Sequence, residues 1–237
     1  MSTPEEARFR VLHEDEHCLG FFKPAGRFLQ GTWAPEGETT VEQDVRRHLD
    51  PKDPESVYLG IVHRLDRPVS GVLIWAKTPK AARRLAGQFE KRQVVKEYWA
   101  VVERRDVSAP AADAGPLPPE GEEWVDWLTA PDRNGVVQSV AEGTPGARSA
   151  RTRAFVDGSR PLPEGLGWLR LWPETGRTHQ LRVQAAVRGA PIVGDAAYGS
   201  SVPFHPGIAL HARSLQVRHP RTAAPLILTA DLPSSWR

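Results

Sequence analysis

Short apolar runs separated by turn residues recur along this chain and limit what it can fold into. The 237 residues include 22 prolines and 20 glycines, and these interrupt the apolar runs before most of them reach helical length. Short runs bounded by glycine and proline are typical of β-strands. The predicted strands cover residues 8–12, 18–23, 57–64, 71–77, 94–103, 124–129, 136–140, 148–156, 167–172, 208–218 and 225–230.

Three segments have the start and stop signals of helices instead. Thr40 and Gln43 have the spacing of a capping box, and Thr78 precedes a proline at the first helical position. Gly189 is a usual C-terminal cap. The predicted helices cover residues 39–49, 79–92 and 176–189. Runs of strands with few helices between them predict an α+β fold with a mixed, mainly antiparallel sheet, flanking helices and a central cleft.

The length suits a single domain over residues 1–237, with the Pro-, Gly- and Ala-rich residues 106–121 as an inserted surface loop. Cys18 is the single cysteine, so no intrachain disulfide is possible and packing must hold the fold. The N-terminus lacks the apolar run of a secretory signal, and no stretch approaches the ~18 apolar residues of a membrane span. The expectation is a soluble, cytoplasmic protein.

Charge is distributed unevenly although the net charge is only +2. Residues 77–105 contain nine Lys or Arg against three acids, and residues 106–130 contain six acids with no Lys or Arg. A polyanion would bind the first segment and avoid the second. A solvated helix face followed by an acidic loop explains the same pattern, so this alternative stays open.

One carboxylate, Asp66, stands out by its position. It lies between Arg64 and Arg67 in the loop that joins two predicted strands. A carboxylate near fixed guanidinium groups stays ionised, which suits a nucleophile better than a general acid. A turn aspartate in an ordinary surface ion pair would look the same at this stage.

The sequence lacks the motifs of several reaction classes. The sequence has no Walker-type phosphate loop, no GxGxxG after a strand and no GxSxG, and one cysteine excludes Cys-rich zinc sites. The function of a metal hydrolase remains an alternative only if five residues gather around a metal ion on folding, although none of their histidines shows the usual i, i+4 pairing. They are His63, His179, His205, His211 and Asp66.

Five blocks of sequence, taken in order and spacing, are similar to one known family. They are CLGFFKPAG (18–26), GIVHRLDRPVSGVLIWAK (60–77), VVKEYWAVV (94–102), TGRTHQLRVQAAVRGAPIVGDAAYG (175–199) and LHARSLQVRHP (210–220). Together they resemble the motifs of the RluA-type RNA pseudouridine synthases. The chain departs from that pattern at Pro68 and Val69, at Gln184 where a histidine is usual, and by having no S4-like module before residue 11.

The resemblance implies an isomerase that converts specific uridines of structured rRNA or tRNA to pseudouridine after the base is flipped out. It assigns Asp66 as the nucleophile, attacking either C1′ of the ribose or C6 of the base. Tyr98 is expected to stack on the uracil and to help remove the C5 proton, and Arg177 to pair with Asp66. A core tyrosine and a surface arginine remain the alternatives for these two residues.

The same resemblance implies a set of substrate-binding residues. Arg64 is expected to fill the gap left by the flipped base or to contact phosphate. The set consists of His63, Arg64, Arg67 and Leu181, and the basic segment 77–105 adds Arg83 and Arg84 as expected RNA-binding residues. The reaction includes no redox step and no hydrolysis, so neither a metal nor an organic cofactor is expected. The expected partner is RNA, the expected state a monomer, and the alternative a non-catalytic RNA-binding protein of the same fold.

Overall fold

The computed structural model describes residues 9–31, 37–103 and 121–236, and the structural statements below concern these residues. The chain divides into two compact units. Unit 1 consists of Met1–Val95 and His211–Arg237, and unit 2 consists of Lys96–Leu210. Unit 2 is therefore inserted into the chain of unit 1. The expectation of one domain over the whole chain stays a prediction.

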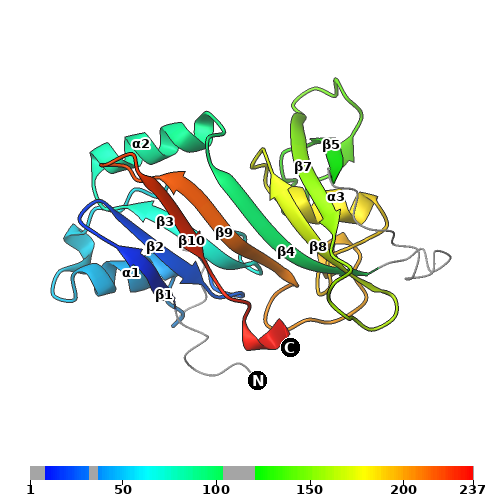
Figure 1. Cartoon of the computed structure of the whole chain (residues 1–237), viewed down its shortest axis with the longest axis horizontal. Helices are drawn as coiled ribbons and strands as arrows, with labels where there is room; N and C mark the ends of the chain where they lie inside the picture. Colours follow the sequence, from blue (N-terminus) through cyan, green and yellow to red (C-terminus); the bar gives the residue numbers. More distant parts are fainter. Residues whose placement is uncertain (1–8, 32–36, 104–120, 237) are drawn as a thin grey trace. The chain divides into compact units, whose positions relative to one another are not determined.

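The sheet of unit 1 combines strands from both ends of the chain. Its neighbours in order are β1 (Arg10–Glu14), β2 (Cys18–Lys23), β3 (Ser70–Ala76) and β9 (Leu210–Arg218), and β10 (Pro225–Thr229) pairs with β9. Figure 1 shows the blue strands β1 and β2 in one sheet with the orange and red strands β9 and β10. Of these pairings only β3–β9 is parallel, through Ser70 with His211 and Gly71 with Ala212.

Two helices accompany this sheet. α1 (Val41–Leu49) begins with the predicted capping box, in which the Thr40 side chain and the Gln43 side chain each accept from the other's backbone N–H. α2 (Pro79–Glu90) is capped by Thr78, as predicted. Its apolar face packs into a core with alternate residues of the strands, because alternate strand residues share one face. The buried members of this core include Cys18, Phe22, Val72, Ile74, Ala81, Leu85, Leu215 and Leu228.

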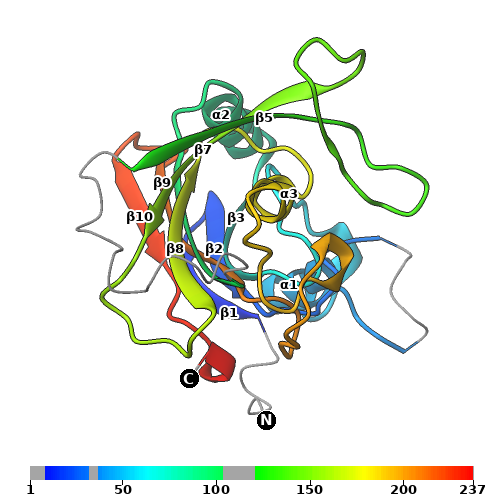
Figure 2. The same cartoon turned by 90° about the vertical axis from the view of Figure 1, so that its right-hand side faces the viewer.

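The strands of unit 2 pair antiparallel with one another. In order they are β4 (Val95–Glu103), β8 (Leu166–Pro173), β7 (Arg148–Val156), β5 (Glu122–Leu128) and β6 (Ser139–Val140). α3 (Gln180–Val187) lies against one face, and Figure 2 shows it beside β7 and β8. Val183 packs there with Leu128, Val137 and Ala150. Short 3₁₀ helices cover Pro54–Ser56, Ala196–Tyr198 and Ser234–Trp236.

The mixed, mainly antiparallel fold is confirmed, but the strand predicted at 57–64 is wrong. That segment makes only an isolated bridge between Gly60 and Ala76. Farther along, the Ile74 amide donates a 3.0 Å hydrogen bond to Nε2 of His63. A side chain therefore takes the place of the backbone carbonyl that a paired strand would offer there. Apart from Gly121, the predicted insertion at 106–121 lies outside the described residues. Within the described part of the chain, no helix has both the length and the apolar character needed to cross a membrane.

Candidate active site

Asp66 lies in a tight turn immediately before β3. Its carbonyl accepts from the Val69 amide at 3.1 Å, which closes the turn, and its side chain is half-buried. The next carbonyl, of Arg67, accepts from the Gly26 amide at 2.8 Å. The turn is therefore hydrogen-bonded to the Lys-Pro-Ala-Gly segment after β2. A nucleophile on a turn needs such backbone contacts to hold a defined position.

Lys23 strengthens this connection from the end of β2. Its side chain is fully buried, and Nζ donates to the carbonyls of Pro24 (2.9 Å), Arg67 (3.1 Å) and Val69 (2.8 Å). Burial lowers the pKa of Lys23 to about 7, while the nearby charge of Asp66 acts in the opposite direction. Lys23 thus binds two carbonyls of the Asp66 turn and places a titratable cation beside it.

The strand that follows the turn is held from the far end of the chain. The Ser70 hydroxyl donates to Nδ1 of His211 at 2.8 Å, and Nε2 of His211 donates to the Ala230 carbonyl at 3.1 Å. Burial lowers the pKa of His211 to about 4, so the ring is neutral and has one donor and one acceptor. At Gly71, φ is +128° and a Cβ would lie 2.3 Å from the Ala212 carbonyl oxygen, so the close strand approach requires glycine.

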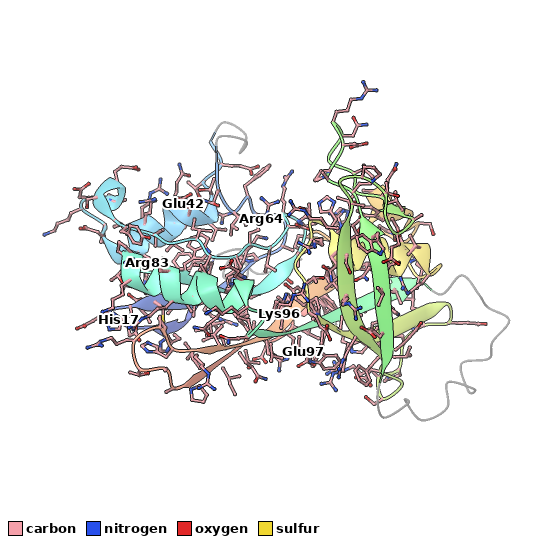
Figure 3. The ribbon with its side chains drawn as sticks, turned by 90° about the horizontal axis from the view of Figure 1, so that it is seen from above. His17, Glu42, Arg64, Arg83, Lys96 and Glu97 are labelled. Carbon is pink, nitrogen blue, oxygen red and sulfur yellow. The ribbon has the colours of Figure 1, made fainter. Side chains whose placement is uncertain are left out.

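Arg67 and Arg64 flank Asp66 and are both exposed. The Arg67 Nε donates to the Gly26 carbonyl at 3.0 Å, and its guanidinium lies 4.1 Å from the centre of the Phe28 ring. Arg67 therefore helps to fix the turn. Figure 3 shows Arg64 on the segment before β3. The predicted contacts of both arginines with RNA stay predictions.

His63 has a structural contact. Besides accepting the Ile74 amide through Nε2, its ring stacks on Phe89 of α2 with the ring centres 4.5 Å apart. These contacts orient the segment that leads to Asp66. The predicted contact of His63 with substrate stays a prediction.

The two predicted phosphate-binding arginines lie on α2. Arg83 is exposed and is labelled in Figure 3, whereas Arg84 donates through Nη1 to the Pro220 carbonyl at 2.7 Å. Within the same basic segment, Lys77 forms an ion pair with Glu14 at 2.8 Å. Arg83 is thus better placed than Arg84 to meet a solvent-side polyanion. The last two arginines of the run, at 104 and 105, lie outside the described residues.

Tyr98 is a half-buried residue of β4 in unit 2. It pairs with Leu171 of β8, which in turn pairs with Ala154 of β7. Thr152, two residues before Ala154, points to the same face and donates to Gln184 of α3 at 2.6 Å. Tyr98 therefore belongs to the face of the unit 2 sheet on which α3 packs.

Arg177 lies in the turn that enters α3. Its Nε donates to the Ser149 carbonyl and its backbone amide donates to Oε1 of Gln180, both at 3.0 Å. His179 precedes the helix with φ of 54°, a left-handed conformation, and its Nδ1 lies 2.8 Å from the Tyr198 hydroxyl. The predicted helix start near 176 is therefore four residues too early, because this segment is a turn.

A buried polar network supports this turn. Gln180 accepts from Thr175 Oγ1 at 2.7 Å and donates to Thr152 Oγ1 at 2.9 Å. Lys96 of β4 donates to the Thr175 carbonyl at 2.9 Å, and burial lowers the Lys96 pKa to about 8. Fully paired buried networks rigidify the backbone that contains them. Arg177 is thus presented by a well-defined segment of unit 2.

Gln184, the residue that departs from the family pattern, is fully buried. Besides accepting from Thr152, it donates through Nε2 to Asp126 Oδ2 at 2.8 Å. Gln184 thereby joins α3 to β7 and β5. The neighbouring Leu181 is 6% exposed, so in this structure it is largely a packing residue and its substrate contact stays a prediction.

Five supporting residues were not predicted as site residues. Besides Lys23, Lys96 and Gln180, they include Arg182 and Asp195, a buried bidentate pair with N–O distances of 2.6 and 2.7 Å. All five stand inside the sequence blocks quoted for the family resemblance, which was the available signal. The pattern did not show that they act through backbone carbonyls or through each other.

The predicted site residues fall into two sets. Unit 1 contains His63, Arg64, Asp66, Arg67, Arg83 and Arg84, and unit 2 contains Tyr98, Arg177 and Leu181. The metal-hydrolase alternative required His63, His179, His205, His211 and Asp66 to gather. Among the described residues, the one potential metal-binding group consists of His13, Asp15, Cys18 and His219 and contains none of those five.

Known proteins agree with this fold and these blocks. The family described as RNA pseudouridylate synthase matches residues 19–187. tRNA pseudouridine synthase C of Yersinia pestis is 34% identical over 244 residues, which cover 96% of this chain and 88% of the relative. Ribosomal large subunit pseudouridine synthase D of Xanthomonas campestris pv. campestris is 32% identical over 248 residues, which cover 98% of this chain and 68% of the relative.

Solved structures support the fold. Human RNA Pseudouridylate Synthase Domain Containing 1 has a TM-score of 0.70 at 22% identity, with 98% of this chain and 87% of that chain covered. Human RNA Pseudouridylate Synthase Domain Containing 4 has a TM-score of 0.68 at 23% identity, with 94% and 88% covered. Fold and sequence matches together define an isomerase that acts on RNA. The chain belongs to the RNA pseudouridylate synthase family, as the five sequence blocks predicted.

Proposed function

We propose that this enzyme isomerises specific uridines of tRNA or rRNA, with the Asp66 carboxylate as its nucleophile. The observation that supports this proposal best is the set of backbone hydrogen bonds around the Asp66 turn. Lys23 and Gly26 bind the carbonyls of Arg67 and Val69, and Ser70 is tied to His211. A nucleophile must be held within reach of one reacting atom, and these contacts serve that purpose.

The reaction breaks the bond between N1 of uracil and C1′ of ribose, turns the base, and forms a bond between C5 and C1′. The C5 proton is lost and N1 gains a proton, so no atoms or electrons are exchanged overall. Asp66 attacks either C1′ or C6 during this sequence. Tyr98 stacks on the flipped base and helps to remove the C5 proton, and the Arg177 guanidinium pairs with the Asp66 carboxylate.

The substrate proposal rests on the names of the relatives. The Yersinia pestis relative is named for tRNA and the Xanthomonas campestris relative for the large ribosomal subunit. We propose that Arg64 and Arg67 contact the RNA around the flipped nucleotide, and that Arg83 contacts a phosphate. We further propose a monomer that works in the cytoplasm without a cofactor.

A non-catalytic RNA-binding protein of the same fold is the competing function. Binding alone requires neither a carboxylate on a fixed turn nor the buried lysine beneath it. One variant distinguishes the two functions. Asp66→Asn keeps the side-chain shape and removes the nucleophile, so it should abolish isomerisation but leave RNA binding intact.

The experiment compares wild type, Asp66→Asn and Asp53→Asn, an exposed aspartate of unit 1 that serves as the control. Transcripts of tRNA and of large-subunit rRNA fragments are incubated with each protein, and pseudouridine is mapped at single-nucleotide resolution. We expect Asp66→Asn to lose activity while its RNA affinity stays within a few-fold, and Asp53→Asn to match wild type. Residual turnover above about 1% of wild type would remove Asp66 from the nucleophile's role, given the losses usual for essential nucleophiles.

A further inference from the structure

Four side chains with metal-binding atoms converge at one end of the unit 1 sheet, outside the candidate active site. His13, Asp15, Cys18 and His219 each offer one ligand atom, and these atoms all lie within 4.8 Å of one another. They come from the β1–β2 hairpin and from the residue after β9. Residues from distant parts of the sequence have therefore been brought to one point.

A β-bulge places His13 in this group. The pairing of β1 with β2 shifts between Val11, which lies opposite Phe21, and His13, which lies opposite Gly20. Without the extra residue, His13 would lie opposite Leu19 and point to the other face of the sheet. With the bulge, His13 shares the face of Gly20 and Cys18. Bulges commonly re-aim one side chain in this way.

His13 and Asp15 are oriented toward the centre of the group. Nε2 of His13 is buried and accepts or donates no hydrogen bond among the described residues, although Asp15 Oδ2 lies 3.4 Å away. Asp15 Oδ1 accepts from the amides of His17 (2.7 Å) and Cys18 (2.9 Å), which directs Oδ2 toward the other ligand atoms. A buried polar nitrogen without a partner is uncommon and calls for one.

His219 completes the set from the end of β9. Its Nε2 lies 2.6 Å from Asp15 Oδ2, and its Nδ1 lies 3.1 Å from Thr222 Oγ1 and accepts from the amides of Arg221 and Thr222. A plain hydrogen bond between His219 and Asp15 satisfies both residues, but within the described part of the chain it leaves Nε2 of His13 without a hydrogen bond. Metal binding at Nε2 therefore requires the His219 proton on Nδ1, with Thr222 Oγ1 as its acceptor, and requires the backbone of Arg221 and Thr222 to move so that their amides no longer donate to Nδ1.

We propose that His13, Asp15, Cys18 and His219 bind one zinc ion that stabilises unit 1. Two imidazoles, one carboxylate and one thiolate form a donor set that suits tetrahedral Zn²⁺. With one thiolate, Zn–N, Zn–O and Zn–S bond lengths place the ligand atoms of a tetrahedral site about 3.3 to 3.6 Å apart, so the widest separation shortens by at most about 1.5 Å on binding. Zinc displaces the thiol proton of Cys18 to solvent and leaves the thiolate as ligand.

The single cysteine makes the test specific. The full chain is stripped with EDTA and titrated with Co²⁺, which takes the same tetrahedral sites as zinc and gives a near-ultraviolet charge-transfer band when a thiolate binds it. Because Cys18 is the chain's single cysteine, such a band reports Cys18 alone. We expect the band to saturate at one equivalent of cobalt and to disappear on addition of zinc.

Two histidine variants provide the matched comparison. We expect His13→Asn to lower zinc affinity at least about tenfold, measured by competition with a chromophoric chelator. His17→Asn is the control, because its ring lies 6.0 Å from that of His219 but is not a member of the group. Figure 3 labels His17. At one fixed zinc concentration, the Tm of wild type and of His17→Asn should rise more than that of His13→Asn, because stabilisation by a ligand falls as its affinity falls.

Cys18 is buried in the core, so a Cys18→Ser variant can fail to fold. The folding of each variant is therefore checked by circular dichroism. His13→Asn tests the proposal even where Cys18→Ser does not fold. A wild-type titration without a thiolate band overturns the proposal. Equal zinc affinities of His13→Asn and His17→Asn also overturn it and leave the hydrogen bond between Asp15 and His219 as the role of this group.

Discussion

Nζ of Lys23 donates a 3.1 Å hydrogen bond to the carbonyl of Arg67, the residue that follows Asp66. The two residues are 44 positions apart in the sequence, and Lys23 is fully buried. Its pKa of about 7 means that the amine changes charge near neutral pH. We therefore expect the position of the proposed nucleophile to depend on Lys23.

Replacing Lys23 tests this dependence. Lys23→Met removes three hydrogen bonds to buried or partly buried carbonyls, so we expect the free energy of unfolding to fall by about 1–3 kcal/mol. We also expect kcat to fall at least about tenfold with little change in KM, because the Asp66 turn loses its fixed position. Urea unfolding and steady-state kinetics measure the two effects. Lys77→Met, at a surface ion pair, is the control, and a wild-type kcat for Lys23→Met would contradict the prediction.

Arg177 is predicted to support the nucleophile electrostatically. We expect Arg177→Ala to reduce the single-turnover rate roughly 100-fold and Arg177→Lys to keep a small part of the activity, because lysine retains the charge but not the planar fork. RNA affinity should stay nearly normal in both variants. Arg148→Ala, an exposed arginine of β7, is the control. If Arg177→Ala isomerises RNA at the wild-type rate, its proposed role is wrong.

The exposed cations of α2 and its C-terminal end are predicted to contact phosphates. Charge reversal at Arg83 and Lys91 should weaken RNA binding and reduce the slope of log affinity against log salt by roughly 1–2, since two phosphate contacts are lost. Arg84 is kept, because it binds the Pro220 carbonyl. Reversal at Lys52 and Arg221, two other exposed cations of unit 1, gives the same change in net charge. Equal slopes for the two double variants would place α2 away from the RNA.

His211 makes stability depend on acid pH. Its folded pKa of about 4 lies below the ordinary value of 6.5, so the unfolded chain takes up a proton first as the pH falls. The contribution of neutral His211 to the free energy of unfolding is fully present at pH 7 and is lost as the pH falls to 4. At 1.36 kcal/mol per pKa unit, the loss is about 3 kcal/mol. His211→Gln should flatten the stability curve between these pH values, and His205→Gln, at an exposed histidine, should not. Parallel curves for wild type and His211→Gln would refute the assignment.

Elements with local signals were predictable from sequence. The Thr40 capping box, the Thr78 cap and most of the apolar strands lie where their residue patterns indicated, although β6 covers only Ser139–Val140 of the predicted 136–140. The segment 57–64 was mispredicted because its apolar pattern is that of a strand, whereas His63 satisfies the β3 amide with its ring. The start of α3 was also predicted too early. His179 adopts a left-handed conformation before the helix, and hydrophobic periodicity does not indicate such a conformation.

The candidate site was predictable only in part. Asp66 was proposed as the nucleophile from its flanking arginines and from family resemblance, and its role stays a prediction. The contacts that hold its turn could not be predicted, because Lys23 binds backbone carbonyls, which every residue has. The same holds for Gln184, whose partners Asp126 and Thr152 become neighbours only after β5 and β7 pair.

The bond between Ser70 and His211 joins residues 141 positions apart, with all of unit 2 between them. During synthesis, the Asp66 turn therefore leaves the ribosome long before the strand that anchors it. Unit 2 has its own strands and helix and can begin to fold while the sheet of unit 1 still lacks β9 and β10. A chain stopped just after residue 209 would contain Asp66, Tyr98 and Arg177, yet the turn that presents the nucleophile would lack its anchor.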